Sequence, residues 1–243
     1  MRRIFVGLAF VAALVLGACD FFISAKATFY QRLTVVVAVD GREVSGSSVQ
    51  KVRYSREKAS LSPQGGGGST AKGEAVVVDL GQGRYLFAMM SDPQGAFRAD
   101  MIAAETFKDL LPERGEARFK GENGLWEYQK AWINELAAIR GARRPAHMPL
   151  LVTFRDITKP ETVTAVDPDN MMAAFPDAPF SSLELKSVAL EIIDEAPLTE
   201  KVESVLGWLN EYRNFMLDGN RYRTADAENQ FSNSLTARFF QSL

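Results

Sequence analysis

The stretch Leu33-Thr34-Val35-Val36-Val37-Ala38-Val39, followed at once by Asp40-Gly41, decides the fold of this chain. Its apolar and β-branched residues are typical of a strand that is buried on both faces. An aspartate followed by a glycine favours the two-residue turn of a β-hairpin, because both positions accept a positive φ. We therefore predict a strand over residues 29–39 that turns directly into an antiparallel partner.

Three further strands are predicted within the first hundred residues. Polar and apolar residues alternate imperfectly over residues 47–55, so both faces of this strand mix polar and apolar side chains. Residues 74–80 and 84–91 are joined by Gly81-Gln82-Gly83, a three-residue connection that suits a bulged hairpin. Strands joined by such local connections form an antiparallel sheet.

Helices are expected between short strands in the rest of the chain. Asp100 can cap a helix that ends before Pro112, and the apolar spacing over residues 125–139 predicts a longer one. The remaining predictions are strands over 150–154, 162–166 and 183–193, a helical turn over 168–174, a helix from Thr199 to Leu209, and a tail over 227–240 with more helical than strand character. Together they predict the α+β class, with antiparallel sheets packed against a few helices.

The chain begins with the three-part pattern of a secretory signal. Arg2 and Arg3 give a positive start, residues 4–16 are apolar or small, and the segment ends in Leu16-Gly17-Ala18-Cys19. This ending resembles the lipobox of bacterial lipoproteins. In that family the cysteine thiol receives a diacylglycerol, the peptide is cut just before the cysteine, and the new amino group is usually acylated. The resemblance implies that Cys19 becomes the first residue of the mature chain.

Two other interpretations of this segment stay open. One is a cleaved signal peptide without lipid. The other is an uncleaved anchor helix, in which Phe21, Phe22 and Ile23 extend the apolar segment across Asp20 at a cost of a few kcal/mol. The apolar core, residues 4–16, has only about half to two-thirds of the roughly 20 residues that a membrane span needs. Cys19 favours the lipoprotein, because it is the only cysteine and an unmodified thiol in an oxidising compartment would seek an intermolecular partner.

The lipoprotein interpretation divides the chain into three parts. Residues 1–18 are the signal peptide, residues 19–28 are a lipidated tether, and residues 29–243 form the α+β domain. This domain is either undivided or split into subdomains at residues 29–145 and 146–243.

Asp20 directly follows the cysteine. In lipoproteins of enteric bacteria, an aspartate at this position tends to keep the protein in the inner membrane. The resemblance therefore implies a lipid anchor on Cys19 in the inner rather than the outer membrane, with the domain facing the periplasm. The implied partners are the membrane itself and proteins of the cell envelope.

The composition is that of an ordinary globular domain. Of the 243 residues, 47% are hydrophobic and 24% are charged, which argues against disorder. Without Arg2 and Arg3 the chain has 26 basic and 30 acidic residues. This mildly acidic balance argues against a nucleic-acid partner.

A second resemblance covers about half of the chain. Its residues are Pro149-Leu150-Leu151-Val152-Thr153-Phe154-Arg155-Asp156, Thr162-Val163-Thr164-Ala165-Val166-Asp167-Pro168, Leu190-Glu191-Ile192-Ile193-Asp194-Glu195-Ala196-Pro197-Leu198-Thr199 and Gly207-Trp208-Leu209. They resemble a family of uncharacterised bacterial envelope or secreted proteins. The resemblance implies a folded unit and no particular chemistry.

Residue types that enzymes and metal sites use are few and scattered. His147 is the only histidine, so neither a Ser-His-Asp arrangement nor the common zinc ligand sets is expected. Asp167, Asp169 and Asn170 resemble half of a calcium loop, but the glycine turn and the bidentate glutamate are missing. We interpret Asp167 as a helix N-cap before Pro168. No catalytic residue, metal ligand or cofactor is predicted.

Residues 57–72 contain Pro63 and the four glycines 65–68, and we predict a mobile loop at a hairpin tip. A phosphate-binding loop requires a lysine and a serine or threonine directly after its last glycine, followed by a helix. Here Ser69-Thr70-Ala71-Lys72 leads into a strand, so the glycine run is not interpreted as a phosphate site.

Arg140, Arg143 and Arg144 form a basic cluster close in sequence to Trp126 and Trp132. Such a cluster could contact anionic lipid headgroups. We interpret it instead as cations at a helix C-terminus, where they complement the helix dipole. All three tryptophans are expected in the core.

The predicted function is a lipid-anchored envelope protein whose domain is a structural or interaction module without catalysis. One alternative is a small-molecule-binding lipoprotein with an apolar cavity lined by some of Phe87, Met89, Met90 and Trp132.

A further alternative is a hydrolase that uses carboxylates. Glu74, Asp79 and Glu191 are its candidate residues. It would require two of these carboxylates to converge in a cleft with raised pKa values.

Overall fold

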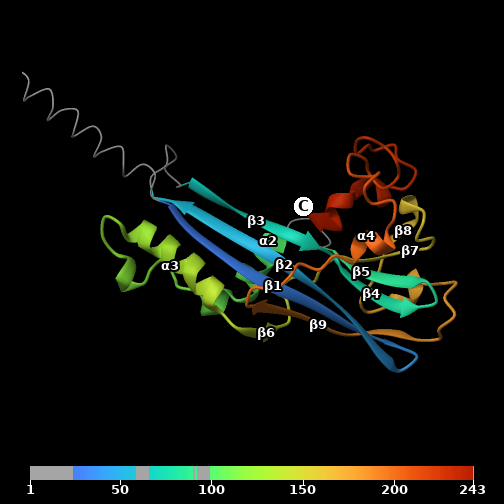
Figure 1. The fold of residues 1–243 in the computed structure, drawn as a ribbon, viewed down its shortest axis with the longest axis horizontal. Helices are drawn as coiled ribbons and strands as arrows, with labels where there is room; N and C mark the ends of the chain where they lie inside the picture. Colours follow the sequence, from blue (N-terminus) through green and yellow to red (C-terminus); the bar gives the residue numbers. More distant parts are fainter. Residues whose placement is uncertain (1–23, 59–65, 90, 92–98, 243) are drawn as a thin grey trace, which may run out of the picture. The chain divides into compact units, whose positions relative to one another are not determined.

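The computed structural model describes residues 24–58, 66–89, 91 and 99–242 (Figure 1). They form two antiparallel sheets with a few helices, so the predicted α+β class is confirmed. The predicted signal peptide, Cys19 and Asp20 lie outside the described residues.

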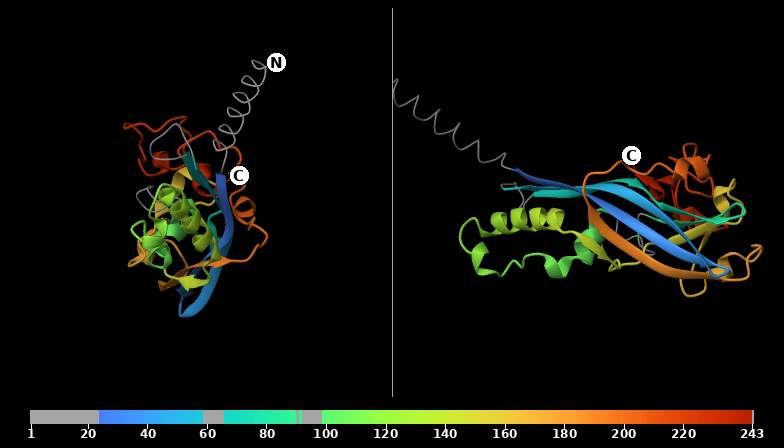
Figure 2. Two further views of the ribbon diagram at one scale, coloured as in Figure 1. Left: turned by 90° about the vertical axis from the view of Figure 1, so that its left-hand side faces the viewer. Right: turned by 60° about the horizontal axis from the view of Figure 1, so that its bottom comes forward.

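The larger sheet has six strands, with β1 and β2 as its longest, neighbouring members (Figure 2). Its spatial order is β10 (Gln241–Ser242), β3 (Gly66–Glu74), β2 (Arg42–Glu57), β1 (Ser24–Val39), β9 (Leu183–Ile193) and β6 (Gly141–Arg143). The smaller sheet has the order β4 (Val76–Gly81), β5 (Arg84–Ala88), β7 (Leu151–Phe154) and β8 (Val163–Ala165).

The described helices are short. The α-helices are α2 (Ala99–Thr106), α3 (Gly124–Ala138) and α4 (Val202–Val205). The 3₁₀ turns are η2 (Lys108–Leu110), η3 (Ala117–Phe119), η4 (Pro160–Thr162), η5 (Met171–Ala174), η6 (Ser232–Ser234) and η7 (Ala237–Phe239). None of these helices has the length and apolar character needed to cross a bilayer, within the part of the chain that the structure describes.

The described residues form two compact units that interleave along the sequence. The first unit consists of residues 24–28, 53–58, 66–70 and 109–139, and the second unit contains the other described residues. Strands β1, β2 and β3 each contribute residues to both units. The predicted alternative division at residue 145 does not coincide with these units.

The β1–β2 hairpin forms as its sequence predicts. Asp40 and Gly41 have φ values of 49° and 79°, the two positive values that a tight hairpin turn requires. Leu33, Val35 and Val37 on one face of β1 are buried, whereas the alternate residues are half-buried. One face of this strand is therefore core and the other is only partly covered, so the predicted burial of both faces is wrong for Thr34 and Val36.

The Asp40 side chain ties the hairpin turn to the start of β9. Its Oδ1 accepts hydrogen bonds from the Ser181 hydroxyl (2.8 Å) and from the backbone N–H groups of Ser181 (2.8 Å) and Ser182 (2.9 Å). These bonds, the Ser181 hydroxyl first, lower the pKa of the Asp40 carboxyl below its ordinary value.

Several other predicted elements are present. Strand β9 covers residues 183–193 as expected, and α3 begins and ends within one residue of the predicted helix. The β4–β5 hairpin contains the expected irregularity, a register shift between Asp79 and Gly81. Gly81-Gln82-Gly83 all have positive φ, which explains the two glycines of this turn.

The prediction of a mobile loop over residues 57–72 is wrong for residues 66–72, which lie in a strand. Strand β3 begins at Gly66, so glycines 66–68 lie in a strand, while residues 59–65, including Gly65, are outside the described residues. Gly67 has φ 136°, and a Cβ at this position would overlap the carbonyl oxygen of Ser55. Glycine is needed there for close approach of two strands, not for a mobile tip.

The predicted tether over residues 19–28 is also too long. Strand β1 begins at Ser24, and Ala27 within it is buried. Ser24, the first residue of β1, lies five residues after Cys19 in the sequence.

The predicted helix from Thr199 to Leu209 is mostly replaced by turns. Only Val202–Val205 is α-helical, and the Thr199 hydroxyl accepts a hydrogen bond from the backbone N–H of Val49 (2.8 Å). The tail over 227–240 is likewise not a continuous helix, because it contains only the turns η6 and η7 before β10.

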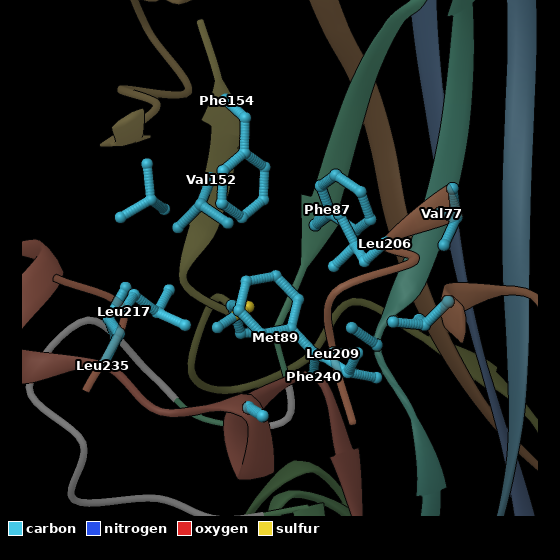
Figure 3. Close-up of a cluster of buried hydrophobic side chains, with 14 of the residues drawn as sticks. Val77, Phe87, Met89, Val152, Phe154, Leu206, Leu209, Leu217, Leu235 and Phe240 are labelled. Atoms are coloured by element: carbon cyan, nitrogen blue, oxygen red, sulfur yellow. The ribbon is translucent and has the colours of Figure 1, made fainter. Parts of the chain in front are cut away.

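The core of the second unit joins the smaller sheet to the C-terminal segment. Phe87, Phe154 and Phe240 point toward one another, with ring centroids 5.6–5.7 Å apart (Figure 3). Leu206 and Leu209 from the segment after α4 pack into the same buried cluster. Burial of these side chains explains why the turns after α4 are stable without a regular helix.

Candidate functional site

A polar hollow of about 600 Å³ lies at the ends of three strands in the first unit. We call it the strand-end hollow. It is lined by Ser24 and Lys26 of β1, Arg53, Ser55 and Glu57 of β2, and Gly68, Ser69 and Thr70 of β3. This lining contains two cations, one carboxylate and several hydroxyls.

The alternation of strand β2 places the lining on one face. Arg53, Ser55 and Glu57 are two residues apart, so their side chains share a face of the sheet. Tyr54 between them is buried and packs edge-on against Trp132 of α3, with ring centroids 5.5 Å apart. Within the first unit, α3 therefore covers the face opposite to the hollow.

The β2–β3 backbone beside the hollow is held in place by Arg56. Its guanidinium donates to the carbonyl oxygen of Ser55 (2.8 Å) and lies 5.5 Å from the centroid of the Tyr54 ring. The Ser55 hydroxyl and Arg56 also approach the carbonyl oxygen of Gly68 at 3.5 Å. Arg56 therefore contacts the backbone of both strands beside the hollow.

A second polar feature surrounds Glu74 in the second unit. The Glu74 side chain is only 1% exposed, and its two oxygens accept the backbone N–H groups of Lys201 (2.6 Å) and Val202 (3.0 Å). Its backbone carbonyl accepts hydrogen bonds from the buried side chains of Ser48 (2.7 Å) and Gln50 (3.2 Å). Glu74 therefore connects β3 both to β2 and to the first turn of α4.

Burial raises the pKa of the Glu74 carboxyl, and the two N–H donors partly offset this effect. The two oxygens do what an N-cap side chain does, although they come from a distant strand. Glu74 was a candidate catalytic carboxylate, and the structure gives it a structural role.

The other two candidate carboxylates have separate partners. Asp79 accepts the backbone N–H of Gly81 within its own turn (2.8 Å), and Glu191 forms an ion pair with Arg32 across β1 and β9 (3.3 Å). Among the residues that the structure describes, no group of three or more histidine, cysteine, aspartate or glutamate side chains is placed to hold a metal ion.

The structure also places the remaining candidate residues from the sequence, His147, Asp167 and Asn170. His147 is half-buried in the connection between β6 and β7. The Asp167 carboxylate accepts the backbone N–H of Asp169 (3.0 Å), and Asn170 precedes η5. Asp167 thus stabilises the turn before η5, but the N-cap of η5 is Asn170, so the predicted capping role of Asp167 is wrong.

Of the basic cluster, only Arg140 directly follows the C-terminus of a helix. Helix α3 ends at Ala138, and Arg143 lies in β6 with its guanidinium 5.4 Å from the centroid of the Phe107 ring. Arg140 forms an ion pair with Asp194 (3.0 Å). The predicted interaction with a helix dipole is therefore wrong for Arg143, which lies on a strand.

The residues predicted to line an apolar cavity belong to different parts of the structure. Phe87 and Met89 are fully buried within the core of the second unit. Trp132 belongs to the first unit and packs on Tyr54, and Met90 lies outside the described residues. Of the tryptophans expected in the core, Trp208 is buried, whereas positions 126 and 132 are half-buried.

A smaller hollow of about 440 Å³ lies in the second unit. It is lined by Asn214, Phe215, Arg221 and Tyr222, and the Arg221 guanidinium is 5.7 Å from the Tyr222 ring centroid. Tyr222 is 71% exposed, the highest value among the large exposed hydrophobic side chains described.

Neither hollow was predicted from the sequence. The pattern Arg53-Tyr54-Ser55-Arg56-Glu57 contains the alternation that builds one wall of the strand-end hollow. The other walls come from β1 and β3, and only strand pairing brings them together with β2. Comparisons of the chain with protein-family models, with curated proteins and with solved structures give no match.

Proposed function

We propose that this protein is a lipid-anchored protein of the bacterial cell envelope, and that its domain is a structural or interaction module without catalysis. One observation carries this proposal. Strand β1 begins at Ser24, five residues after the Cys19 that ends the lipobox-like segment. Five extended residues span at most about 18 Å, so a lipid on Cys19 would hold the start of β1 close to the membrane surface.

The roles of the candidate catalytic side chains support a module without catalysis. Glu74 caps α4, Asp79 closes a hairpin turn, and Glu191 pairs with Arg32. Each of these carboxylates has a partner in the fold of the domain. The proposed partners are the membrane and other envelope proteins, with the domain facing the periplasm.

The proposal is tested by the mass of the N-terminal peptide of the full-length protein, isolated from bacterial membranes. We expect this peptide to begin at Cys19 and to carry acyl chains. An intact chain from Met1 would instead support an uncleaved anchor, and a cleaved but unmodified Cys19 would support plain secretion. Either result would contradict the lipid-anchored function.

Asp20 is proposed to retain the protein in the inner membrane. The Asp20→Ser variant should therefore move a substantial part of the protein to the outer membrane, while its lipid is retained. Fractionation of the two membranes measures this distribution. An Asp79→Ser variant, altered at an exposed turn, is the control and should stay where the wild type is. Equal distributions of wild type and Asp20→Ser would exclude a sorting role.

A further inference from the structure

We propose that the strand-end hollow binds the phosphate of anionic phospholipid headgroups in the membrane that holds the lipid on Cys19. This inference rests on the proposed lipid anchor. It adds a second, non-covalent contact between the domain and the membrane, made by Lys26 and Arg53.

The length of the chain before β1 is the first argument. Ser24, the first residue of β1, is itself part of the lining, and Lys26 follows two residues later on the same face. With Cys19 anchored, Ser24 lies within about 18 Å of the lipidated residue, and the hollow begins there. Headgroups of the same membrane are thus the ligands present at highest local concentration.

Charge is the second argument. Lys26 and Arg53 have no ion-pair partner among the residues that the structure describes, although both line the same hollow. A lysine and an arginine near a surface of anionic lipids are each attracted to it, and an arginine can bind a phosphate through two parallel hydrogen bonds. The mildly acidic balance of the whole chain makes this local excess of positive charge distinctive.

The neutral groups of the lining fit the same ligand. Ser24 and Thr70 supply hydroxyls that can donate hydrogen bonds to phosphate oxygens. The one carboxylate, Glu57, is the last residue of β2, and its side chain packs against Gly66. The Glu57 carboxylate therefore lies at the end of β2, and Ser55 separates it from Arg53 along the strand.

Lysine acetylation footprinting of the full-length protein tests this inference. The protein is reconstituted in vesicles of phosphatidylcholine alone or of phosphatidylcholine mixed with phosphatidylglycerol, and treated with an uncharged acetylating reagent. We expect acetylation of Lys26 to slow several-fold in the phosphatidylglycerol vesicles. Lys120, an exposed lysine of the first unit outside the lining, should react equally in both.

A matched pair of variants identifies the second cation. Arg53→Gln removes a charge from the hollow and should abolish the protection of Lys26. Arg114→Gln removes the same charge from an exposed position of the first unit outside the lining, and should preserve the protection. The loss of one charge corresponds to roughly a fivefold weaker interaction with the surface. A circular dichroism spectrum equal to that of the wild type shows that the Arg53→Gln variant is still folded.

Each outcome of this experiment is decisive. Lys26 that reacts equally in both vesicles, or protection that survives Arg53→Gln, would overturn the inference. Equal protection by inorganic phosphate in phosphatidylcholine vesicles would assign the hollow to free phosphate instead of lipid. The same digest contains the Cys19 peptide: a lipidated Cys19 with an unprotected Lys26 overturns this inference alone, whereas an unlipidated Cys19 overturns the proposed function as well.

Discussion

Replacing Cys19 with serine should abolish fatty-acid incorporation and leave residues 1–18 on the chain. The thiol is the atom that would receive the diacylglycerol, and a serine hydroxyl is a much weaker nucleophile. By the same resemblance, cleavage follows lipidation, so both modifications should be lost together. Metabolic labelling with a fatty acid and the mass of the full-length protein measure the two effects.

Ala18→Gly is the matched control for this variant. It keeps a small residue directly before the cysteine and should be labelled and cleaved like the wild type. Labelling that persists in Cys19→Ser would place the lipid elsewhere or exclude it from this segment. Removal of residues 1–18 from the unlabelled variant would indicate a plain secretory signal peptide.

The β1–β2 hairpin could be predicted because its determinants are local. Asp40-Gly41 accepts two positive φ values, and the residues before it are strongly β-forming. Such patterns need no information about distant parts of the chain. The same holds for the bulged connection at Gly81-Gln82-Gly83.

The errors have non-local causes. Glycines 66–68 were assigned to a loop on composition, but pairing with β2 makes them a strand and requires glycine at position 67. The helix after Thr199 is short because Thr199 bonds to Val49 and the α4 terminus bonds to Glu74, partners more than a hundred residues away. Helix periodicity contains no information about such contacts.

The strand-end hollow was missed for the same physical reason. Its lining comes from three strand segments, and their alignment depends on the register between strands and not on any one segment. Only the alternation around Tyr54 was visible in the sequence. In contrast, Cys19 and Asp20 were recognised from a local motif, and they remain predictions because the structure does not describe them.

Glu74→Ala should destabilise the second unit more than any other single carboxylate substitution discussed for this chain. The alanine leaves the backbone N–H groups of Lys201 and Val202 without their acceptors, and Val202 is fully buried. A buried donor without a partner costs about 1–3 kcal/mol, so the expected loss is roughly 2–4 kcal/mol in the free energy of unfolding. Urea unfolding of the full-length protein in detergent measures this loss.

Glu200→Ala is the control for the same charge change, made in the segment that directly precedes α4. Glu200 is exposed, and its charge raises the pKa of Glu74 by repulsion. Its removal should change the free energy of unfolding by less than about 0.5 kcal/mol. Similar losses in Glu74→Ala and Glu200→Ala would show that the bonds to α4 do not contribute to stability.

The raised pKa of Glu74 also makes its contribution to the free energy of unfolding depend on pH. Because burial raises the folded-state pKa above the ordinary value of 4.5, the folded protein holds the Glu74 proton more tightly than the unfolded chain does. The free energy of unfolding due to this group is therefore highest below pH 4.5 and falls as the pH rises through the folded-state pKa. Glu74→Gln cannot titrate, so it should lack this fall.

The difference in unfolding free energy between wild type and Glu74→Gln isolates this group. As the pH is lowered from neutral to below 4.5, the free energy of unfolding of the wild type should rise relative to that of Glu74→Gln. Asp40, whose pKa is lowered and whose contribution therefore decreases in acid, is present in both proteins and cancels in the difference. A difference that is constant with pH would mean that Glu74 is no harder to ionise in the folded protein than in the unfolded chain. The bonds from Lys201 and Val202 would then fully offset the effect of burial.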